Sequence, residues 1–151
     1  MEPSLDVTIR LVEESDLPAM QELLSMNGFP ISMSDLRYRY ELYKKATLNR
    51  GWVVIDNAQQ KMLGYVAVIA NQGVRSAKLS ARVINLFISP VYRRQGIGKK
   101  LLAVVEEYMA AIGCTDLEFI MPEIDPEIAE HFYSTLGYKL SPERDAYVAE
   151  K

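Results

Sequence analysis

The residues best suited to chemistry form a short stretch between a predicted strand and a predicted helix, R-R-Q-G-I-G-K at positions 93–99. The start of a helix leaves backbone N–H groups unpaired and carries partial positive charge, so it favours anions. Gly96 and Gly98 let the backbone approach an anion without obstruction by a side chain. Basic side chains flank the two glycines (Arg93, Arg94, Lys99 and Lys100). The stretch therefore predicts a site for a di- or polyphosphate.

Two common phosphate-binding motifs do not fit this stretch. A Walker-type loop requires Ser or Thr after its glycine–lysine pair, whereas Lys100 follows Gly98-Lys99 here. A dinucleotide fingerprint requires a small residue three positions after the second glycine, where the sequence has Leu101. The phosphate site must therefore belong to another class.

The elements on either side of the loop have to position it. Residues 82–88 (RVINLFI) read as a strand that ends at Ser89-Pro90. From Ile97, apolar residues recur at helical spacing as far as Gly113, which predicts the strongest helix of the chain. Residues 115–121 read as the next strand, so the loop lies at a strand–helix–strand junction.

The other elements complete a mixed α/β (α+β) chain with a mostly antiparallel sheet. Residues 7–12 predict a first strand, Ser15 is the predicted cap of a helix, and Ser32 with Asp35 predicts a capping box for a second helix. Further along lie a predicted hairpin (52–55 and 62–70), a helix with Asp125 as its cap, and one or two strands within 138–149. The expected order is β-α-α-β-β-β-α-β-α-β(-β), in a single domain over residues 1–151.

Two motifs in order resemble one known family. The loop, read as R-x-x-G-x-G over residues 93–98, closely resembles the coenzyme A pyrophosphate loop of the GNAT superfamily of N-acyltransferases. The segment F-Y-S-T-L-G-Y at 132–138 is similar to the F-Y-x-x-L-G-F/Y segment of the same family. Across nearly the whole chain, the order of elements is also similar. The resemblance implies a GNAT-like sheet flanked by helices and acetyl-CoA as co-substrate.

The same resemblance implies which residues bind the co-substrate. In this family the strand before the loop splays away from its neighbour and pairs its backbone with the pantetheine arm. The corresponding strand residues here are Leu86, Phe87 and Ile88. Arg93 would lie at the entry of the loop, and the backbone of the next six residues would hold the pyrophosphate (Arg94, Gln95, Gly96, Ile97, Gly98 and Lys99).

The catalytic residues are also carried over from the resemblance. Tyr133 matches the tyrosine that the family often places near the thioester sulfur, where a phenol can donate a proton; packing beside the ligand is the alternative. Members often use a carboxylate to take the proton of the amine. The strand before the loop offers Arg82 and Asn85 but no carboxylate, so Glu118 on the next strand is the first candidate. Glu123 and Asp125 are the second, and an ordinary surface acid is the alternative for each.

Composition and charge limit the other possibilities. The chain has 151 residues, one cysteine (Cys114) and one histidine (His131), so we expect no disulfide and no metal site. Without an apolar stretch of about 20 residues or a basic, apolar N-terminus, we expect a cytoplasmic protein that does not bind membranes. Residues 37–100 carry a net charge of +11 and residues 101–138 a net charge of −8. These blocks favour an anionic and a cationic ligand, unless they are only solvated helix faces.

The resulting hypothesis is an acetyl-CoA-dependent N-acetyltransferase. It would transfer the acetyl group to a primary amine of a small molecule, peptide or protein by direct attack in a ternary complex. The acidic segment favours a cationic amine. The first alternative is a non-catalytic acetyl-CoA-binding sensor of the same fold. The second is a nucleic-acid binder, for which the sequence shows no recognition motif. The resemblance to the family also makes a homodimer possible.

Overall fold

The computed structural model describes residues 6–72, 79–93, 95–114, 116–120, 134, 138–141 and 146–149. The strands among them form one seven-stranded sheet in the order β1-β2-β3-β4-β5-β7-β6. The strands are β1 (Val7–Leu11), β2 (Arg50–Asp56), β3 (Lys61–Gln72), β4 (Leu79–Ile88), β5 (Asp116–Ile120), β6 (Tyr138–Ser141) and β7 (Ala146–Ala149). The helices are α1 (Leu17–Met26), α2 (Met33–Lys44) and α3 (Ile97–Ile112), with two 3-10 turns, η1 (Glu14–Asp16) and η2 (Pro90–Tyr92).

The sheet contains one parallel pair. Strands β1 to β4 form an antiparallel meander, and β5, β7 and β6 also pair antiparallel. Between these two groups, β4 and β5 pair in parallel, because α3 carries the chain back along the sheet between them. This arrangement confirms the predicted α/β (α+β) class and the mostly antiparallel sheet.

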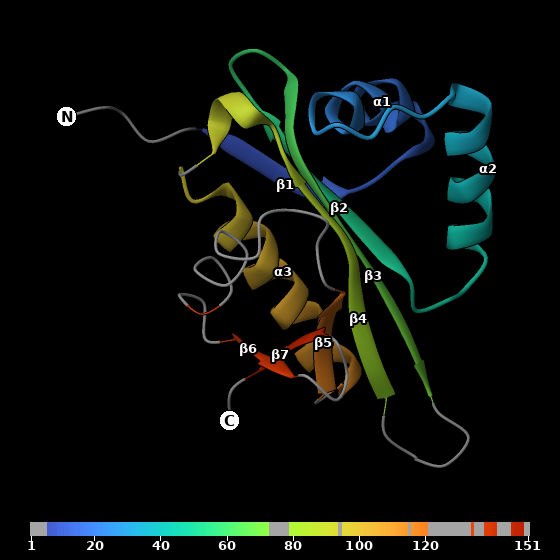
Figure 1. Ribbon diagram of the computed structural model, residues 1–151, viewed down its shortest axis with the longest axis vertical. Coiled ribbons are helices and arrows are strands. Elements are labelled where there is room, and N and C mark those ends of the chain that lie inside the picture. Colours follow the sequence, from blue (N-terminus) through green and yellow to red (C-terminus); the bar gives the residue numbers. More distant parts are fainter. Residues whose placement is uncertain are drawn as a thin grey trace.

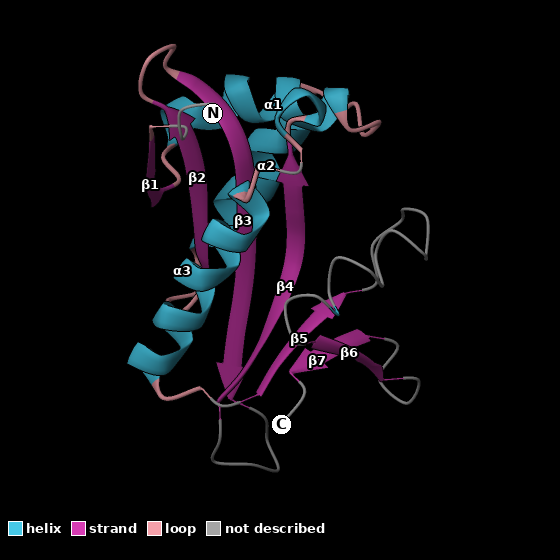
Figure 2. Cartoon of the chain, turned by 90° about the vertical axis from the view of Figure 1, so that its left-hand side faces the viewer, coloured by secondary structure: helices cyan, strands magenta, loops and turns pink. Residues whose placement is uncertain are grey.

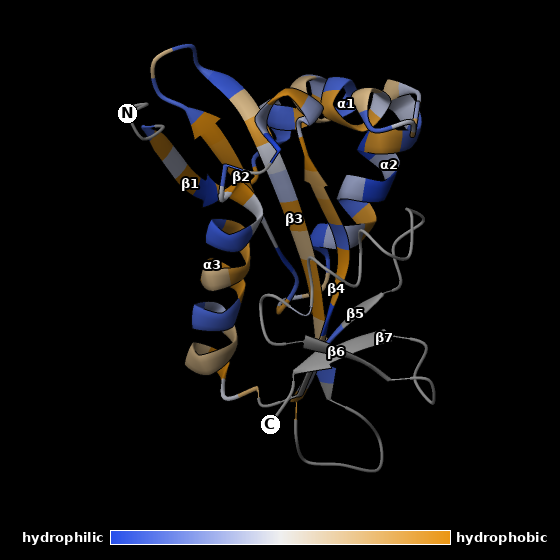
Figure 3. Ribbon diagram, turned by 60° about the vertical axis from the view of Figure 1, so that its left-hand side comes forward, coloured by the Kyte–Doolittle hydropathy of each residue, from blue (hydrophilic) through white to orange (hydrophobic). Residues whose placement is uncertain are grey.

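Helix α3 covers one face of the sheet (Figure 1). Its residues Ile97, Leu101 and Val105 are at most 2% exposed and pack in one cluster with Val66 and Val68 of β3. Complete burial of such a side chain contributes about 1.5–3 kcal/mol. Figure 3 shows the same pattern as a hydrophobic stripe on the sheet-facing side of α3. The start of α3 is thus fixed by its own core residues.

Helices α1 and α2 cover the opposite face (Figure 1). Leu17 and Leu23 of α1 are buried with Val53 of β2 and Ala67 of β3. Helix α2 contributes less to this cluster, since Leu36 is its only fully buried residue among those described. Most of the α2 surface therefore faces solvent.

The predicted helix ends are largely confirmed. Ser32 caps α2 by accepting a hydrogen bond from the N–H of Asp35 at 3.1 Å, and Gly113 ends α3 with a left-handed φ of 76°. The prediction for Ser15 was wrong. A reciprocal capping box between Glu13 and Asp16 starts a 3-10 turn there, and Ser15 lies inside that turn.

Several predictions fall outside the described residues. They include the helix expected after Asp125 and the positions of Glu123, His131 and Tyr133. Of that segment, the structure describes Ser134, which is helical. In the described part of the chain, no helix has both the length and the hydrophobicity needed to cross a membrane.

Candidate functional site

The predicted phosphate loop forms the N-terminus of α3. The chain leaves β4 through the η2 turn, and Gly96 becomes the N-cap of α3 with φ 79° and ψ 9°. L-residues adopt this left-handed conformation at a cost of about 1–2 kcal/mol, which explains the glycine. A glycine cap has no side chain to bond the N–H groups of the first turn, so those groups are left for an external acceptor. Lys99 and Lys100 are exposed beside them, and Arg94 lies outside the described residues.

A side-chain clamp holds the entrance of this loop. Nη2 of Arg93 donates to Oδ1 of Asn27 at 2.8 Å. Nδ2 of Asn27 in turn donates to the carbonyl oxygens of Leu23 at 2.9 Å and Ile88 at 3.2 Å. Asn27 thereby joins the end of α1, the end of β4 and the loop. Sequence reasoning missed Asn27, because an asparagine before Gly28 reads as an ordinary helix end.

A glycine below the loop allows its elements to approach closely. A Cβ atom on Gly64 of β3 would lie 3.1 Å from Cδ1 of Ile88, 3.2 Å from the carbonyl oxygen of Phe87 and 3.3 Å from Cγ2 of Ile97. Such distances are tighter than ordinary contacts, so a side chain there would separate the end of β4 from the start of α3. Gly64 was also missed, since its role depends on residues distant in sequence.

Strand β4 separates from β5 as it approaches the loop. The parallel ladder runs from the pair Ser80–Asp116 to the pair Val83–Phe119. Beyond it, β4 continues to Ile88 and pairs with β3 through residues 85–88, and no described strand pairs with its other edge. Figure 2 shows β5 diverging from β4 over this stretch. The result is an opening between β4 and β5, along which this edge of β4 has no strand partner within the described part of the chain.

The side chains of this part of β4 point into the two cores. Leu86 and Ile88 pack with the α3 cluster, whereas Phe87 packs with the α1–α2 cluster and contacts Phe29 edge-to-face, with 5.5 Å between ring centroids. Their side chains therefore fix the strand, and their backbone edge faces the opening. The predicted residues Leu86, Phe87 and Ile88 thus lie next to the start of α3.

The predicted base, Glu118, lies at the closed end of the opening. It faces Arg82 across the β4–β5 ladder. Its Oε1 accepts hydrogen bonds from Nη2 of Arg82 at 2.6 Å and from Nε at 3.1 Å. The Glu118 side chain is 14% exposed and that of Arg82 is 49% exposed. Measured along β4 from Arg82 to Ile88, the two ends of the opening are about 20 Å apart. A ligand that reaches both must be long.

Other ionisable groups have structural roles. Burial raises the pKa of Tyr43 and Tyr65 far above their ordinary value, so both phenols stay protonated; the Tyr43 hydroxyl donates to the Val68 carbonyl at 3.0 Å. Cys114 is buried and its Sγ lies 3.2 Å from the Leu79 carbonyl oxygen. No cluster of three metal-ligating side chains occurs among the described residues.

Solved structures with the same fold cover most of the chain. An acetyltransferase from Trypanosoma brucei is 23% identical, with a TM-score of 0.76 over 90% of this chain and 94% of that chain. An aminoglycoside 6'-N-acetyltransferase from Acinetobacter baumannii is 18% identical, with a TM-score of 0.74 over 89% and 91%. A chain of the NatC complex bound to a Gag peptide and CoA is 18% identical, with a TM-score of 0.71 over 95% of both chains. At these identities the likeness shows the fold.

The family follows from the sequence itself. No curated protein matches the sequence at a significant level. The family model described as "Acetyltransferase (GNAT) family" matches residues 17–138. This range includes the β4–β5 opening, the α3 start and the Arg82–Glu118 pair. The chain belongs to the GNAT family of acetyltransferases.

Proposed function

We propose that the protein is an N-acetyltransferase that takes an acetyl group from acetyl-CoA and transfers it to a primary amine. The acceptor would be a small molecule, a peptide or a protein, and the amine would attack directly in a ternary complex. The observation that carries this proposal is the geometry of the β4–β5 opening. An anion-binding helix start lies at one end of it, and a carboxylate lies at the other.

The donor set fits acetyl-CoA, the acyl donor typical of the family. The uncapped N–H groups of residues 96–99 suit a pyrophosphate, and Arg93 and Lys99 add positive charge. Apart from the Ile88 carbonyl, which accepts from Asn27, the outer backbone edge of residues 86–88 has no strand partner among the described residues, and such an edge suits a chain that carries amide groups. When bound, acetyl-CoA supplies an activated acetyl thioester. The opening of about 20 Å separates the pyrophosphate site from the acceptor site.

Glu118 is the proposed general base. A primary amine has a pKa near 10.4, so its deprotonation at pH 7 costs about 4–5 kcal/mol, and a nearby base has to take that proton. Glu118 is mostly buried and lies at the end of the opening opposite the phosphate site. Arg82 holds its carboxylate in one orientation through two hydrogen bonds.

Tyr133 remains the proposed proton donor to the leaving sulfur. It lies outside the described residues, so this role rests on the family resemblance. Tyr133→Phe should lower kcat and leave the acetyl-CoA affinity unchanged. Unchanged kcat would reduce Tyr133 to a packing residue.

The direct test is release of free thiol from acetyl-CoA in the presence of a panel of primary amines. We expect amine-dependent thiol release and mass-spectrometric detection of the N-acetyl product. Thiol release that does not depend on any amine would contradict transfer.

One observation favours a second candidate, a non-catalytic acetyl-CoA sensor. The Glu118 carboxylate is already engaged by Arg82, as in a purely structural ion pair. A sensor would bind acetyl-CoA as tightly as an enzyme but would turn over no amine. A cytoplasmic location, a homodimer and the lack of nucleic-acid or membrane partners remain predictions.

A further inference from the structure

The Arg82–Glu118 pair uses only part of the Arg82 guanidinium. Both hydrogen bonds reach the same oxygen of Glu118, and both come from the Nε–Nη2 side of the group. A guanidinium has five N–H donors. The edge formed by Nη1 and the second N–H of Nη2 has no hydrogen-bond partner among the described residues. Because the side chain is 49% exposed, this edge is accessible to a ligand.

The free edge has the geometry of an anion site. Two parallel N–H groups of a guanidinium bind a carboxylate in a bidentate fashion. Arg82 alternates along β4 with Ala81 and Val83, which belong to the α3-side core. Its side chain therefore lies on the other face of the sheet, together with α1 and α2.

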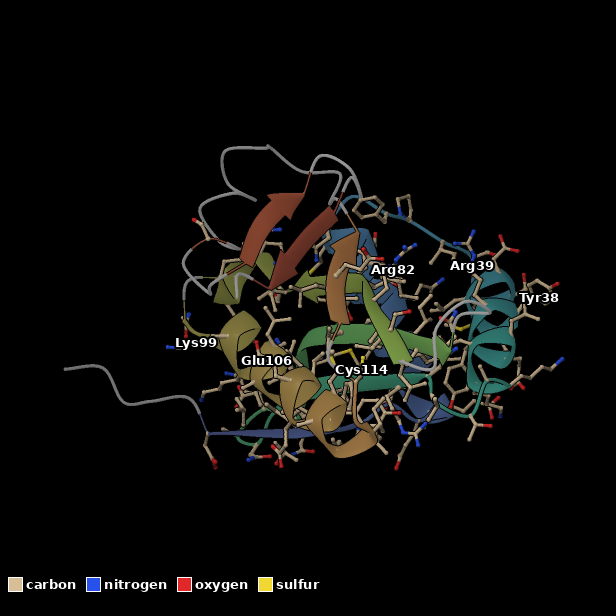
Figure 4. The ribbon with its side chains drawn as sticks, turned by 90° about the horizontal axis from the view of Figure 1, so that it is seen from below. Tyr38, Arg39, Arg82, Lys99, Glu106 and Cys114 are labelled. Carbon is tan, nitrogen blue, oxygen red and sulfur yellow. The ribbon has the colours of Figure 1, made fainter. Side chains whose placement is uncertain are left out.

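Basic residues of α2 lie on the same face of the sheet as Arg82. Exposed basic residues on and just after α2 outnumber the acids, and two of them, Arg39 and Lys45, form no ion pair within the described part of the chain. Arg39 lies three residues after buried Leu36, at the edge of the sheet-facing side of α2. Figure 4 shows Arg39 and Arg82 on the same side of the sheet. A positive surface of this kind attracts an anionic ligand.

The acids of α3 do not offset this charge. Glu106 and Glu107 are exposed on α3, and Figure 4 shows Glu106 with Lys99 on the opposite side of the molecule from Arg39. Among the acids of residues 101–138 whose side chains the structure describes, Glu118 alone lies at the opening. At the opening, an acceptor on this face of the sheet therefore meets the Glu118 carboxylate beside Arg82, and the exposed cations of α2 lie further along the same face.

We propose that Arg82 binds an anionic group of the acceptor, and that the preferred acceptor is a zwitterion with a carboxylate close to its primary amine, as in an amino acid. This inference rests on the proposed acetyl transfer. The amine has to reach Glu118 while the carboxylate reaches the free edge of Arg82. Since these two side chains are hydrogen-bonded to each other, the two groups of the acceptor have to be separated by only a few bonds.

The test compares kcat/KM for an amino acid and for its amide, which keeps the amine but lacks the carboxylate. An aminoalkyl phosphate serves as a third acceptor that distinguishes a carboxylate from another anion. We expect the wild-type protein to prefer the amino acid over its amide by tenfold or more. Arg82→Met should remove this preference, and Arg82→Lys should retain part of it. The ratio of kcat/KM for the amino acid to kcat/KM for its amide is measured within one variant. A general loss of kcat, caused when Glu118 loses its partner, lowers both values and therefore leaves this ratio unchanged.

Two further readouts separate this proposal from the proposed function. The acetyl-CoA affinity should be the same in Arg82→Met and wild type, which shows that the variant is folded and its donor site intact. Calorimetric binding of each acceptor to the CoA-loaded protein provides a measurement independent of turnover. Equal use of acid and amide by the wild type would overturn the zwitterion proposal and leave acetyl transfer standing. Preference for the aminoalkyl phosphate over the amino acid would overturn the carboxylate as the anionic group that Arg82 binds and would indicate a phosphate in its place. If no acceptor either reacts or binds, both proposals are overturned.

Discussion

The two ends of the β4–β5 opening are built from different kinds of groups. At the open end, the proposed binding groups are the backbone of residues 96–99 and the edge of β4, and the side chains of Leu86 and Ile88 fix the strand. At the closed end, the proposed chemistry depends on two side chains, Arg82 and Glu118. The positions of backbone groups are set by the fold and are kept when single residues change. Side-chain groups are lost or altered by a single substitution. A single substitution should therefore affect the closed end more than the open end.

The largest effect is expected at the closed end. Glu118→Gln keeps the shape of the side chain and removes the base, so kcat should fall at least 100-fold. The acetyl-CoA affinity, measured by calorimetry, should stay within twofold of wild type, because the open end is untouched. Glu107→Gln, on the exposed surface of α3, is the matched control and should retain full activity. If kcat in Glu118→Gln is unchanged, the base has to be sought elsewhere.

At the open end, a matched pair of glycines separates strain from binding. Gly96 and Gly113 both have left-handed φ angles, 79° and 76°, and an added Cβ atom would meet no atom within 4 Å at either position. Each change to alanine should therefore cost about 1–2 kcal/mol of folding stability. Gly96→Ala alone should weaken acetyl-CoA binding, by about tenfold, because it disturbs the N-terminus of α3. If the two variants bind acetyl-CoA with equal affinity, the start of α3 is not part of the acetyl-CoA site.

A smaller effect is expected for the clamp that supports the open end. Asn27→Ala removes the hydrogen bonds to Arg93 and to the Ile88 carbonyl. We expect a three- to tenfold loss of acetyl-CoA affinity, since each such bond contributes about 1 kcal/mol. The ratio of kcat/KM between two acceptors should not change, because Asn27 is distant from Glu118. A change in that ratio would show that the two ends are coupled.

A second arginine–carboxylate pair shows what a purely structural pair does. Arg10 donates to both carboxylate oxygens of buried Asp16 at 2.8 Å. Burial alone would raise the pKa of Asp16, but the hydrogen bonds from Arg10 and from the N–H of Glu13 outweigh it, so this pKa lies below its ordinary value. The ionised carboxylate therefore stabilises the fold above its unfolded pKa of about 3.9, and this stability is lost as the pH falls through the folded pKa.

Asp16→Asn should consequently lower the thermal midpoint at pH 7 by about 5 °C, for a loss of about 2 kcal/mol. It should also flatten the decline of stability between about pH 5 and pH 2. Thermal melts across pH measure both effects, and acetyl transfer at 25 °C should be unaffected. Reduced turnover in a folded Asp16→Asn protein would show that this pair is more than structural.

The open end could be predicted from the sequence and the closed end only in part. The glycines at 96 and 98, the basic residues and the helical period from Ile97 are all local patterns, so the loop, β4 and α3 were found from residues 82–113. Glu118 was identified as a candidate, but its contact with Arg82 depends on the parallel register of β4 and β5, which no local pattern records. Asn27 and Gly64 contact residues that are distant in sequence, so no local sequence pattern indicates their roles.

The proposed function requires that the α3 start and the β4 edge form an acetyl-CoA site. This site is tested by calorimetric titration of the folded protein with acetyl-CoA, with ATP and NADH as controls. We predict saturable binding of one acetyl-CoA per chain, weakened about tenfold in Gly96→Ala, with no comparable binding of ATP or NADH. Absence of acetyl-CoA binding, or equal binding of all three ligands, would contradict the claim.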